Sequence, residues 1–269
     1  MHGLQNHFVI VDGRKESYRP DVEEIARICD QRVGIGADQL VVLEPPRAAG
    51  ADVFMRLYNT DGREVGACGN ATRCVAWRML DERGADQVHV ETLAGVLACT
   101  RVGEHQVRCD LGPVSADWRS IPLAREHEFG RIDLAGLDGG FALNIGNPHL
   151  VFFVPDVDAL NLRAIATEIQ GNALFPESVN VGVAQRRSDS GLRLRVFERS
   201  AGLTMACGTG ACAAACAASR SGLIGTQPVT VELPGGDVLV DFTAGDGGAT
   251  HAIMTGPVAV SFRGEIPGS

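Results

Sequence analysis

The sequence predicts an α+β protein made of two pseudo-symmetric domains, each a barrel-like, mostly antiparallel sheet around one central helix. Short apolar runs separated by turn residues recur along the whole chain and indicate many strands. Each half also holds one helix of small residues that begins directly after a cysteine–glycine turn. The two leading cysteines, Cys68 and Cys207, are 139 residues apart, about half of the 269-residue chain. This spacing indicates two copies of one fold.

In the first half, apolar positions within 21–31 recur at helical spacing, and the helix after Cys68 is expected to run to a stop at Gly84. The polar, irregular stretch 115–131 is expected to be the crossing into the second half. The strands expected in this half are 8–12, 39–43, 53–58, 88–92, 95–100 and 106–110.

In the second half, 160–170 is expected to be a helix, and the helix after Cys207 is expected to stop at Gly222. The expected strands are 141–145, 150–154, 179–184, 192–197, 229–233 and 238–242. The tail 256–260 echoes Gly112–Val114, so it is predicted to return to the first domain as a strand. The predicted domains are therefore 1–115 with 256–269, and 116–255.

Other polar landmarks recur at nearly the same offset as the cysteines. Asn6 matches Asn147, and both precede an apolar run. Gln39 likewise matches Asn180. Asn59 precedes Cys68 by nine residues, as Glu198 precedes Cys207. These pairs strengthen the prediction of an internal repeat.

Composition and charge restrict the class of protein. The net charge of −9 argues against nucleic acid or an anionic membrane as a partner. Because no apolar window is long enough for a membrane span and no secretory signal is visible, we expect a cytoplasmic protein. Eight cysteines in such a protein are expected to be reduced. Six of them have apolar neighbours and are predicted to be core residues: Cys29, Cys74, Cys99, Cys109, Cys212 and Cys216. A zinc site at Cys207, Cys212 and Cys216 is a weaker alternative, because CxxC spacing and a nearby histidine are missing.

A cysteine at a helix N-terminus lies beside backbone N–H groups that favour negative charge. Cys68 and Cys207 are therefore expected to form thiolates readily, and the same N–H groups can hold a carboxylate. Two such thiols suit the removal of a proton from one face of a carbon and its delivery to the other face. Lys15, the only lysine, lies in a polar turn and is a poor candidate for a pyridoxal phosphate Schiff base. No cofactor and no metal are expected.

Several segments resemble the diaminopimelate epimerase family, in the family's order and over nearly the whole chain. They are Met1–Asn6, Gly36–Gln39, Asn59–Cys74, Gly146–His149, Glu198–Arg199 and Ala206–Gly210. The resemblance implies a cofactor-independent epimerase that interconverts LL- and meso-diaminopimelate in lysine and peptidoglycan synthesis, with its site in the cleft between the domains. It also suggests a homodimer. Proline racemases and related enzymes share the cysteine turns.

The resemblance assigns roles residue by residue. It implies that Cys68 and Cys207 are the catalytic base and acid, and that Glu198 and His149 tune their pKa values. The residues implied to bind substrate are Asn6, Gln39, Asn59, Gly69, Asn70, Asn147, Asn180, Glu198, Arg199, Gly208 and Thr209.

The chain departs from the family pattern at Gln5, His7, Ala71, Leu203 and Met205. These departures concern the fine geometry of substrate binding and not the reaction. Two alternatives stay open. The first is an epimerase or racemase of another amino acid on the same fold, and the second is a non-catalytic, redox-sensing thiol protein. An adjacent acid and base at Glu198 and Arg199 favour a zwitterionic amino acid over the sensor.

Overall fold

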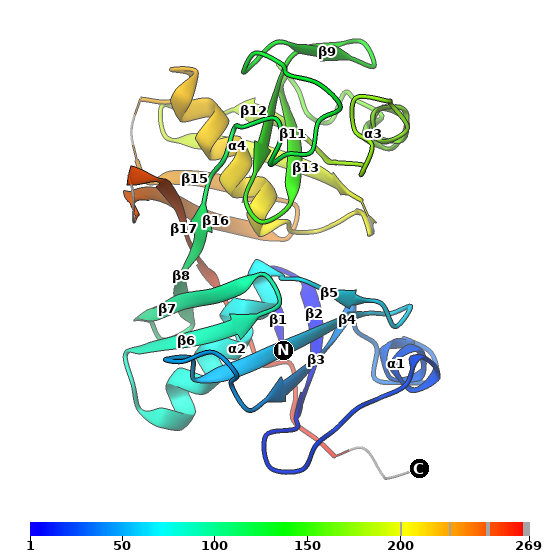
Figure 1. Cartoon of the computed structure of the whole chain (residues 1–269), viewed down its shortest axis with the longest axis vertical. Coiled ribbons are helices and arrows are strands. Elements are labelled where there is room, and N and C mark those ends of the chain that lie inside the picture. The colour runs from blue at the N-terminus through cyan, green and yellow to red at the C-terminus, as the bar shows by residue number, and fades with distance from the viewer. Residues whose placement is uncertain (200, 226, 246–247, 266–269) are drawn as a thin grey trace. The chain divides into compact units, whose positions relative to one another are not determined.

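The computed structural model describes residues 1–199, 201–225, 227–245 and 248–265. The chain forms two compact units (Figure 1): unit 1 is Met1–Cys109 with the segment from Gly256 on, and unit 2 is Asp110–Thr255. The chain leaves unit 1 within β8 (Gln106–Pro113) and returns to it within β17 (Thr250–Pro257). Four α-helices in the described ranges accompany many strands, which confirms the α+β class. The division into two separate domains at residues 115 and 256 stays a prediction.

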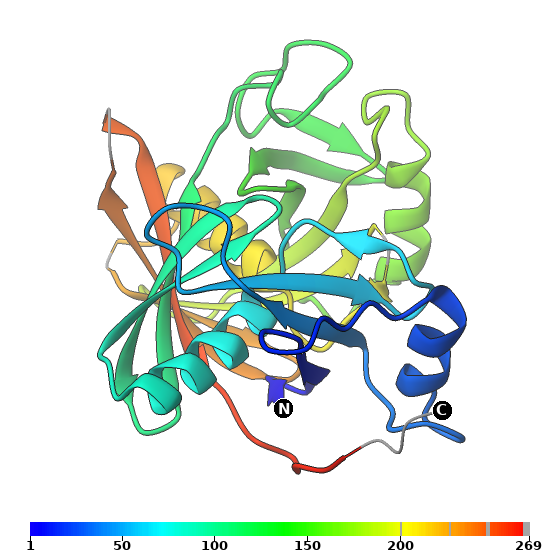
Figure 2. The same ribbon diagram turned by 60° about the horizontal axis from the view of Figure 1, so that its bottom comes forward.

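Unit 1 consists of strands around one long helix. Helix α1 (Val22–Cys29) is capped by the Asp21 carboxylate, which accepts the Glu24 N–H at 2.8 Å. Helix α2 (Gly69–Arg83) packs against β6 and β7 (Figure 2) and ends at Gly84, whose φ of 60° suits a left-handed cap. The remaining strands are β1 (His2–Gly3), β2 (Asn6–Asp12), β3 (Gln39–Glu44), β4 (Val53–Asn59), β5 (Glu64–Val65), β6 (Gln87–Thr92) and β7 (Gly95–Gly103).

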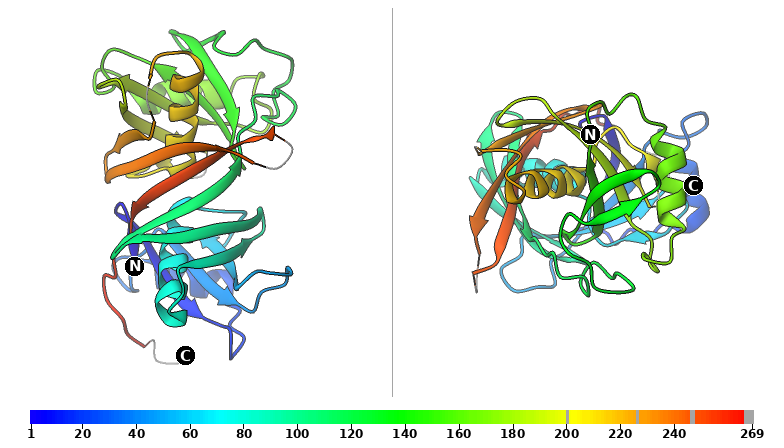
Figure 3. Two further views of the ribbon diagram at one scale, coloured as in Figure 1. Left: turned by 90° about the vertical axis from the view of Figure 1, so that its left-hand side faces the viewer. Right: turned by 90° about the horizontal axis from the view of Figure 1, so that it is seen from above.

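Unit 2 repeats this plan. Its central helix α4 (Gly208–Arg220) contacts strands on several sides (Figure 3), and its alanines and cysteines are fully buried. Helix α3 (Leu162–Gln170) covers an apolar cluster that includes Phe152 and Val181. The strands are β9 (Ile132–Leu134), β10 (Leu137–Asn144), β11 (Pro148–Phe153), β12 (Asn180–Arg186), β13 (Gly191–Glu198), β14 (Gly202–Leu203), β15 (Val229–Leu233) and β16 (Gly236–Ala244).

Strand pairing shows the internal repeat directly. β2 and β3 are parallel with Phe8 opposite Gln39, and β11 and β12 are parallel with His149 opposite Asn180. Each residue of the second pair thus lies 141 residues after its counterpart in the first pair. Each unit has a second parallel pair, β4 with β6 and β13 with β15, and the long helix lies between the two strands of that pair in the sequence. The other pairs within each unit are antiparallel.

The core residues largely follow the sequence-based expectations. All six cysteines predicted to be core residues are buried, with exposures of 4% or less.

The stretch 115–131 is not the crossing between halves, because it lies wholly within unit 2 and the crossing is made by β8. The last strand begins at Thr250, earlier than expected, but the tail does return to unit 1. There His2 and Ala259 exchange backbone hydrogen bonds of 2.8 and 2.9 Å.

Candidate active site

Cys68 is the N-cap of α2. Its backbone is extended (φ −147°, ψ 115°), and its carbonyl accepts the Thr72 N–H at 2.9 Å, the first bond of the helix. The side chain is therefore held at the N-terminus of a 15-residue helix whose first turn, from Gly69, is buried. The electrostatic field at this end of a helix favours an anion. This is the environment predicted for the first catalytic cysteine.

The Cys68 thiol contacts Asn6, and Asn6 contacts Asn70. Its S–H donates to Asn6 Oδ1, with sulfur and oxygen 3.9 Å apart. The same oxygen accepts Asn70 Nδ2–H at 3.2 Å. Asn6 stands at the start of β2 and Asn70 in the first turn of α2, so the packing of these elements brings three predicted site residues together.

Gln39 and Asn59 form a second predicted group in unit 1. They are register partners at the ends of antiparallel β3 and β4. Gln39 Nε2–H donates to Asn59 Oδ1 at 2.9 Å. Both side chains are half-buried, so each amide keeps polar atoms available for a ligand.

Cys207 is the N-cap of α4, as Cys68 is of α2. Its backbone is again extended (φ −123°, ψ 103°), and its carbonyl accepts the Ala211 N–H at 2.9 Å. The residue is 5% exposed. Thr209 Oγ1 lies 3.7 Å from Cys207 Sγ, close enough for a hydrogen bond to sulfur. Gly208 is the first residue of the helix and is buried.

His149 lies behind Thr209. Its Nε2 is 2.9 Å from Asn147 Oδ1 and 3.0 Å from Thr209 Oγ1. Burial, and next the positive charge of Arg199, lower its pKa to about 3, so the ring is neutral at neutral pH. Because an amide oxygen only accepts, Nε2 carries the proton of that ring.

Glu198 and Arg199 follow one another at the end of β13 but have different surroundings. Burial raises the pKa of the Glu198 carboxyl, and hydrogen bonds from Thr204 (2.7 Å) and Cys207 oppose that rise. Arg199 is exposed, and its backbone N–H donates to Oδ1 of buried Asn180 at 2.9 Å. In unit 2 the predicted residues thus form two contact groups: one around Cys207, and one of Asn180 with Arg199.

Lys15 is exposed, unlike the desolvated lysine that a Schiff base requires. No set of three or more His, Cys, Asp or Glu side chains in the described ranges could hold a metal ion. Among the described residues, no helix is both long and apolar enough to span a bilayer.

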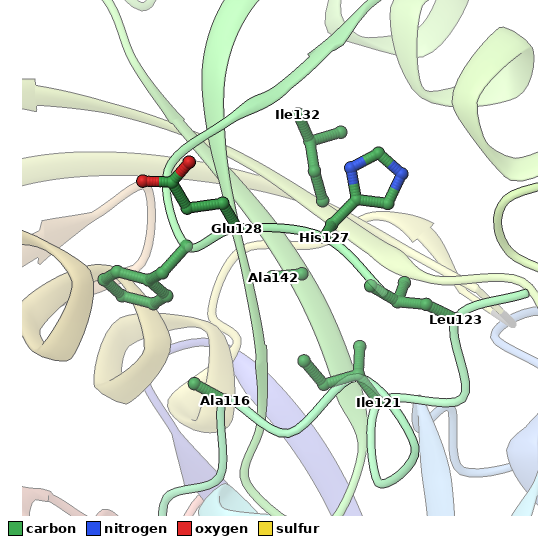
Figure 4. Close-up of a pocket in the computed structure, with 8 residues that line it drawn as sticks. Ala116, Ile121, Leu123, His127, Glu128, Ile132 and Ala142 are labelled. Atoms are coloured by element: carbon green, nitrogen blue, oxygen red, sulfur yellow. The ribbon is translucent and has the colours of Figure 1, made fainter. Parts of the chain in front are cut away.

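A small pocket in unit 2 lies apart from the predicted residues. Figure 4 shows its lining, mainly Ile121, Leu123 and Ile132, with the His127 ring beside them. Its volume of about 10 Å³ is room for one water molecule, and Nε2 of His127 is buried with no partner in the described structure. This pocket is too small for an amino acid.

Sequence reasoning missed Asp38, Arg73 and Thr204, whose side chains form hydrogen bonds with side chains of the predicted residues. Asp38 and Arg73 lie inside motifs that resemble the family, but neither stands out by chemistry or by the repeat. Val179 and Cys212 occupy the corresponding positions of unit 2, so the repeat does not mark Asp38 or Arg73.

Comparison with known proteins identifies the family of this chain. The family model described as diaminopimelate epimerase matches residues 1–116 and 141–260. The diaminopimelate epimerase of Phenylobacterium zucineum is 48% identical over 99% of this chain and 96% of its own. That of Rhodospirillum centenum is 44% identical over 99% and 90%.

Solved structures share the fold at low identity. A hydroxyproline epimerase from Agrobacterium vitis superposes with a TM-score of 0.67 at 14% identity, covering 95% of this chain and 86% of its own. A PhzF-family phenazine biosynthesis protein from Bacillus anthracis gives 0.65 at 16%, covering 96% and 92%. At this identity the likeness concerns the fold alone, whereas the sequence matches over nearly the whole length establish the family. The chain belongs to the diaminopimelate epimerase family.

Proposed function

We propose that this protein epimerises diaminopimelate between its LL and meso forms by two-base proton transfer, with Cys68 and Cys207 as base and acid. The observation that carries the proposal is the duplication of the cysteine cap. Each unit holds one thiol at the N-terminus of its central helix, at the same place in the repeated topology. Family membership supplies the substrate.

The chemistry follows from what these caps offer. An α-hydrogen of an amino acid is a very weak acid, so the developing negative charge must be stabilised in the transition state. Helix N-termini that hold the α-carboxylate supply fixed dipoles for this purpose. One thiolate removes the hydrogen and the other thiol protonates the opposite face, and the two exchange roles in the reverse direction. The proposal therefore requires that the substrate contact both thiols, one on each face of its α-carbon.

The remaining predicted residues would bind and orient the substrate. The side chains of Asn6, Gln39, Asn59, Asn147 and Asn180 offer amides, and Glu198 with Arg199 offers a charge pair for a zwitterion. The first-turn N–H groups at Gly69, Asn70, Gly208 and Thr209 would hold the reacting carboxylate. His149, neutral and fixed by Asn147, would orient the Thr209 hydroxyl beside Cys207.

Turnover in deuterium oxide tests the two-base step. The proton delivered comes from a thiol already equilibrated with solvent, so the epimerised carbon of the product should carry deuterium from the first turnovers. Recovered substrate should carry little. Return of the original hydrogen to the opposite face would contradict the mechanism.

Alanine variants of the two cysteines test the assignment. Cys68→Ala and Cys207→Ala should each abolish epimerisation, because each direction needs both a base and an acid. Cys29→Ala and Cys216→Ala remove buried core thiols, one in each unit, and serve as matched controls. They should lose stability but keep turnover. Near-normal epimerisation by either capping variant would refute the assignment.

Substrate range separates this proposal from its nearest rival. Purified protein is offered LL-diaminopimelate, proline, histidine and glutamate, and the epimers are resolved by chiral chromatography. We expect turnover of diaminopimelate, unchanged by EDTA and without added pyridoxal phosphate. Turnover of another amino acid alone would point to a different racemase on this fold.

The association state and the cellular location are further parts of the proposal. The family resemblance suggests a cytoplasmic homodimer. Sedimentation velocity tests the dimer at micromolar concentration, and a sedimentation coefficient that fits 28.4 kDa would show a monomer instead.

A further inference from the structure

The Thr204 hydroxyl lies against the Glu198 carboxyl in unit 2. Its Oγ1–H donates to Glu198 Oε1 at 2.7 Å. The topology brings the two residues together, because β14 pairs antiparallel with the end of β13 and places Gly202 opposite Glu198. Thr204 follows β14 directly and stands three residues before Cys207. One short segment therefore carries both the hydroxyl that contacts Glu198 and the thiol at the helix N-terminus.

The hydrogen bonds that Glu198 accepts favour its ionised form. Burial raises the pKa of this carboxyl, and the hydrogen bonds from Thr204 and Cys207 lower it without cancelling the effect of burial. A carboxylate only accepts hydrogen bonds, so a hydroxyl and a thiol that donate to it stabilise the charged form over the neutral acid. The pKa of Glu198 already lies above its ordinary value, and the loss of a donor would raise it further toward neutral pH.

The internal repeat offers a comparison for this contact. At the offset of 139 residues that separates the two capping cysteines, Asn59 occupies the position of Glu198, and Val65 occupies that of Thr204. Asn59 is a neutral amide whose oxygen accepts Gln39 Nε2–H at 2.9 Å, and Val65 has no hydroxyl. The hydroxyl is thus found in the unit that has the ionisable side chain and not in the unit that has the amide.

Other titratable side chains in this part of unit 2 act differently on Glu198. Cys207, at the start of α4, donates to the carboxyl only while it keeps its proton. Arg199 follows Glu198 in the sequence, but its guanidinium donates to a backbone carbonyl at 3.1 Å. His149, on β11, is neutral at neutral pH because burial lowers its pKa to about 3. Thr204 is a donor that persists while the proton of Cys207 moves in the proposed reaction.

We propose that Thr204 is a positioning residue that holds the Glu198 carboxyl beside Cys207 in its ionised form. The inference rests on the proposed function, in which Glu198 and Arg199 bind the charged groups of a zwitterion. Glu198 can hold the substrate ammonium only while it is a carboxylate. The hydroxyl therefore extends the pH range of substrate binding toward acid.

NMR titration of Glu198 tests the inference without using activity. Protein labelled with carbon-13 at the glutamate carboxyl is titrated between pH 4 and 9, and the Glu198 signal is assigned by its absence from Glu198→Gln. Thr204→Val and the smaller Thr204→Ala both remove the donor, so each should raise the titration midpoint by about one pH unit. Thr204→Ser keeps a hydroxyl and should leave the midpoint close to its native value. An unchanged midpoint without the hydroxyl would overturn the inference.

The pH profile of epimerisation tests the positioning role. The value of kcat/KM for diaminopimelate reports the ionisations of the free enzyme. In Thr204→Val the acid limb of this profile should move to higher pH by the same amount as the NMR midpoint, which is about a tenfold loss on the acid side. In Thr204→Ser it should stay in place. An acid limb that does not move, or a loss that is equal at every pH, would mean a merely structural role and would overturn the proposal.

The pH dependence of stability gives a second readout that does not need activity. A carboxyl whose pKa is raised on folding destabilises the protein above that pKa and costs nothing below the pKa of the unfolded chain. Thr204→Val should therefore lower the urea midpoint more at pH 8 than at pH 5. In a Glu198→Gln background the side chain no longer titrates, so the same change should lower the midpoint equally at both pH values. An equal loss already in the native background would overturn the proposal.

Thr167→Val is the matched control. It removes another threonine hydroxyl of unit 2, which donates to the Arg163 carbonyl within α3 at 2.8 Å. This change should leave the Glu198 midpoint and the acid limb in place, and circular dichroism confirms that each variant is folded. A shift of the Glu198 midpoint equal to that in Thr204→Val would overturn the specific role of Thr204. If Glu198 titrates as expected in a protein that does not epimerise diaminopimelate, the proposed function alone is refuted.

Discussion

Gly210 is the third residue of α4, where a side chain would press on the Cys207 thiol. A Cβ added there would lie 3.2 Å from Cys207 Sγ and 3.0 Å from Val196 Cγ2. Val196 is 2% exposed and belongs to β13, so it has little room to move. Ala71 fills the corresponding position of α2 and is itself 0% exposed. We therefore predict that Gly210→Ala impairs turnover more than it impairs folding.

The contacts set the size of the effect. Ordinary contact begins at 3.4 Å, so the thiol must retreat by at least about 0.2 Å. Since a misplacement of ~1 Å can cost ~100-fold in rate, we expect a loss in kcat of about 3- to 10-fold. Alanine in place of glycine favours the helix by about 1 kcal/mol. Overpacking against Val196 costs about 1–3 kcal/mol, which leaves a net loss of about 0–2 kcal/mol.

Chiral chromatography of the diaminopimelate epimers gives kcat, and urea unfolding gives the free energy of unfolding. Ala71→Gly is the matched control, since it makes the reciprocal exchange in the other unit. It should lower stability by about 1 kcal/mol and reduce kcat less than Gly210→Ala does. An unchanged kcat in Gly210→Ala would refute the reasoning, because the methyl group would then fit without moving the thiol.

Three further predictions concern stability, measured by urea unfolding. The pKa of buried His149 is lowered from 6.5 to about 3, so the unfolded chain takes up a proton that the folded protein excludes. The free energy of unfolding should therefore fall as pH drops from 6.5 toward 3, by up to about 1.4 kcal/mol per pH unit, and His149→Gln should flatten that slope. Arg56→Met should cost about 3 kcal/mol, because Arg56 is the more buried of the two arginines that lie 2.7 Å from the buried Glu44 carboxylate. A further Glu44→Gln change that restores nothing would contradict this. Gln5→Gly should stabilise the protein by about 1 kcal/mol, because Gln5 has a φ of 63°; equal or lower stability would refute strain there.

The caps could be predicted from sequence because their signals are local. A cysteine before glycines and small residues specifies a strand-to-helix turn, and the structure places Cys68 and Cys207 at the N-cap positions. The repeat could also be predicted, because a shared offset of 141 residues places Phe8 opposite Gln39 as it places His149 opposite Asn180.

Other features depend on tertiary contacts and left no local signal. Strand β9 and the start of β10 lack a run of apolar residues, and they pair with each other as antiparallel strands. The contacts of Asp38 and Arg73 with the two asparagines depend on β2 meeting the first turn of α2. Leu203 and Met205, which depart from the family pattern, are 42% and 43% exposed, and nothing in the structure explains their choice.

The return of the chain to unit 1 has a consequence for synthesis on the ribosome. His2 pairs with Ala259, and His105 accepts the Val258 N–H at 3.0 Å, so unit 1 is complete only after all of unit 2 has been translated. At about 5–20 residues per second, the 146 residues from Asp110 to Thr255 take about 7–30 s. During that interval the nascent first unit lacks the backbone partners of His2 and His105, while unit 2 emerges as one uninterrupted segment. The second unit in sequence is thus the first whose residues have all been translated, because the residues that complete the first unit begin only at Gly256.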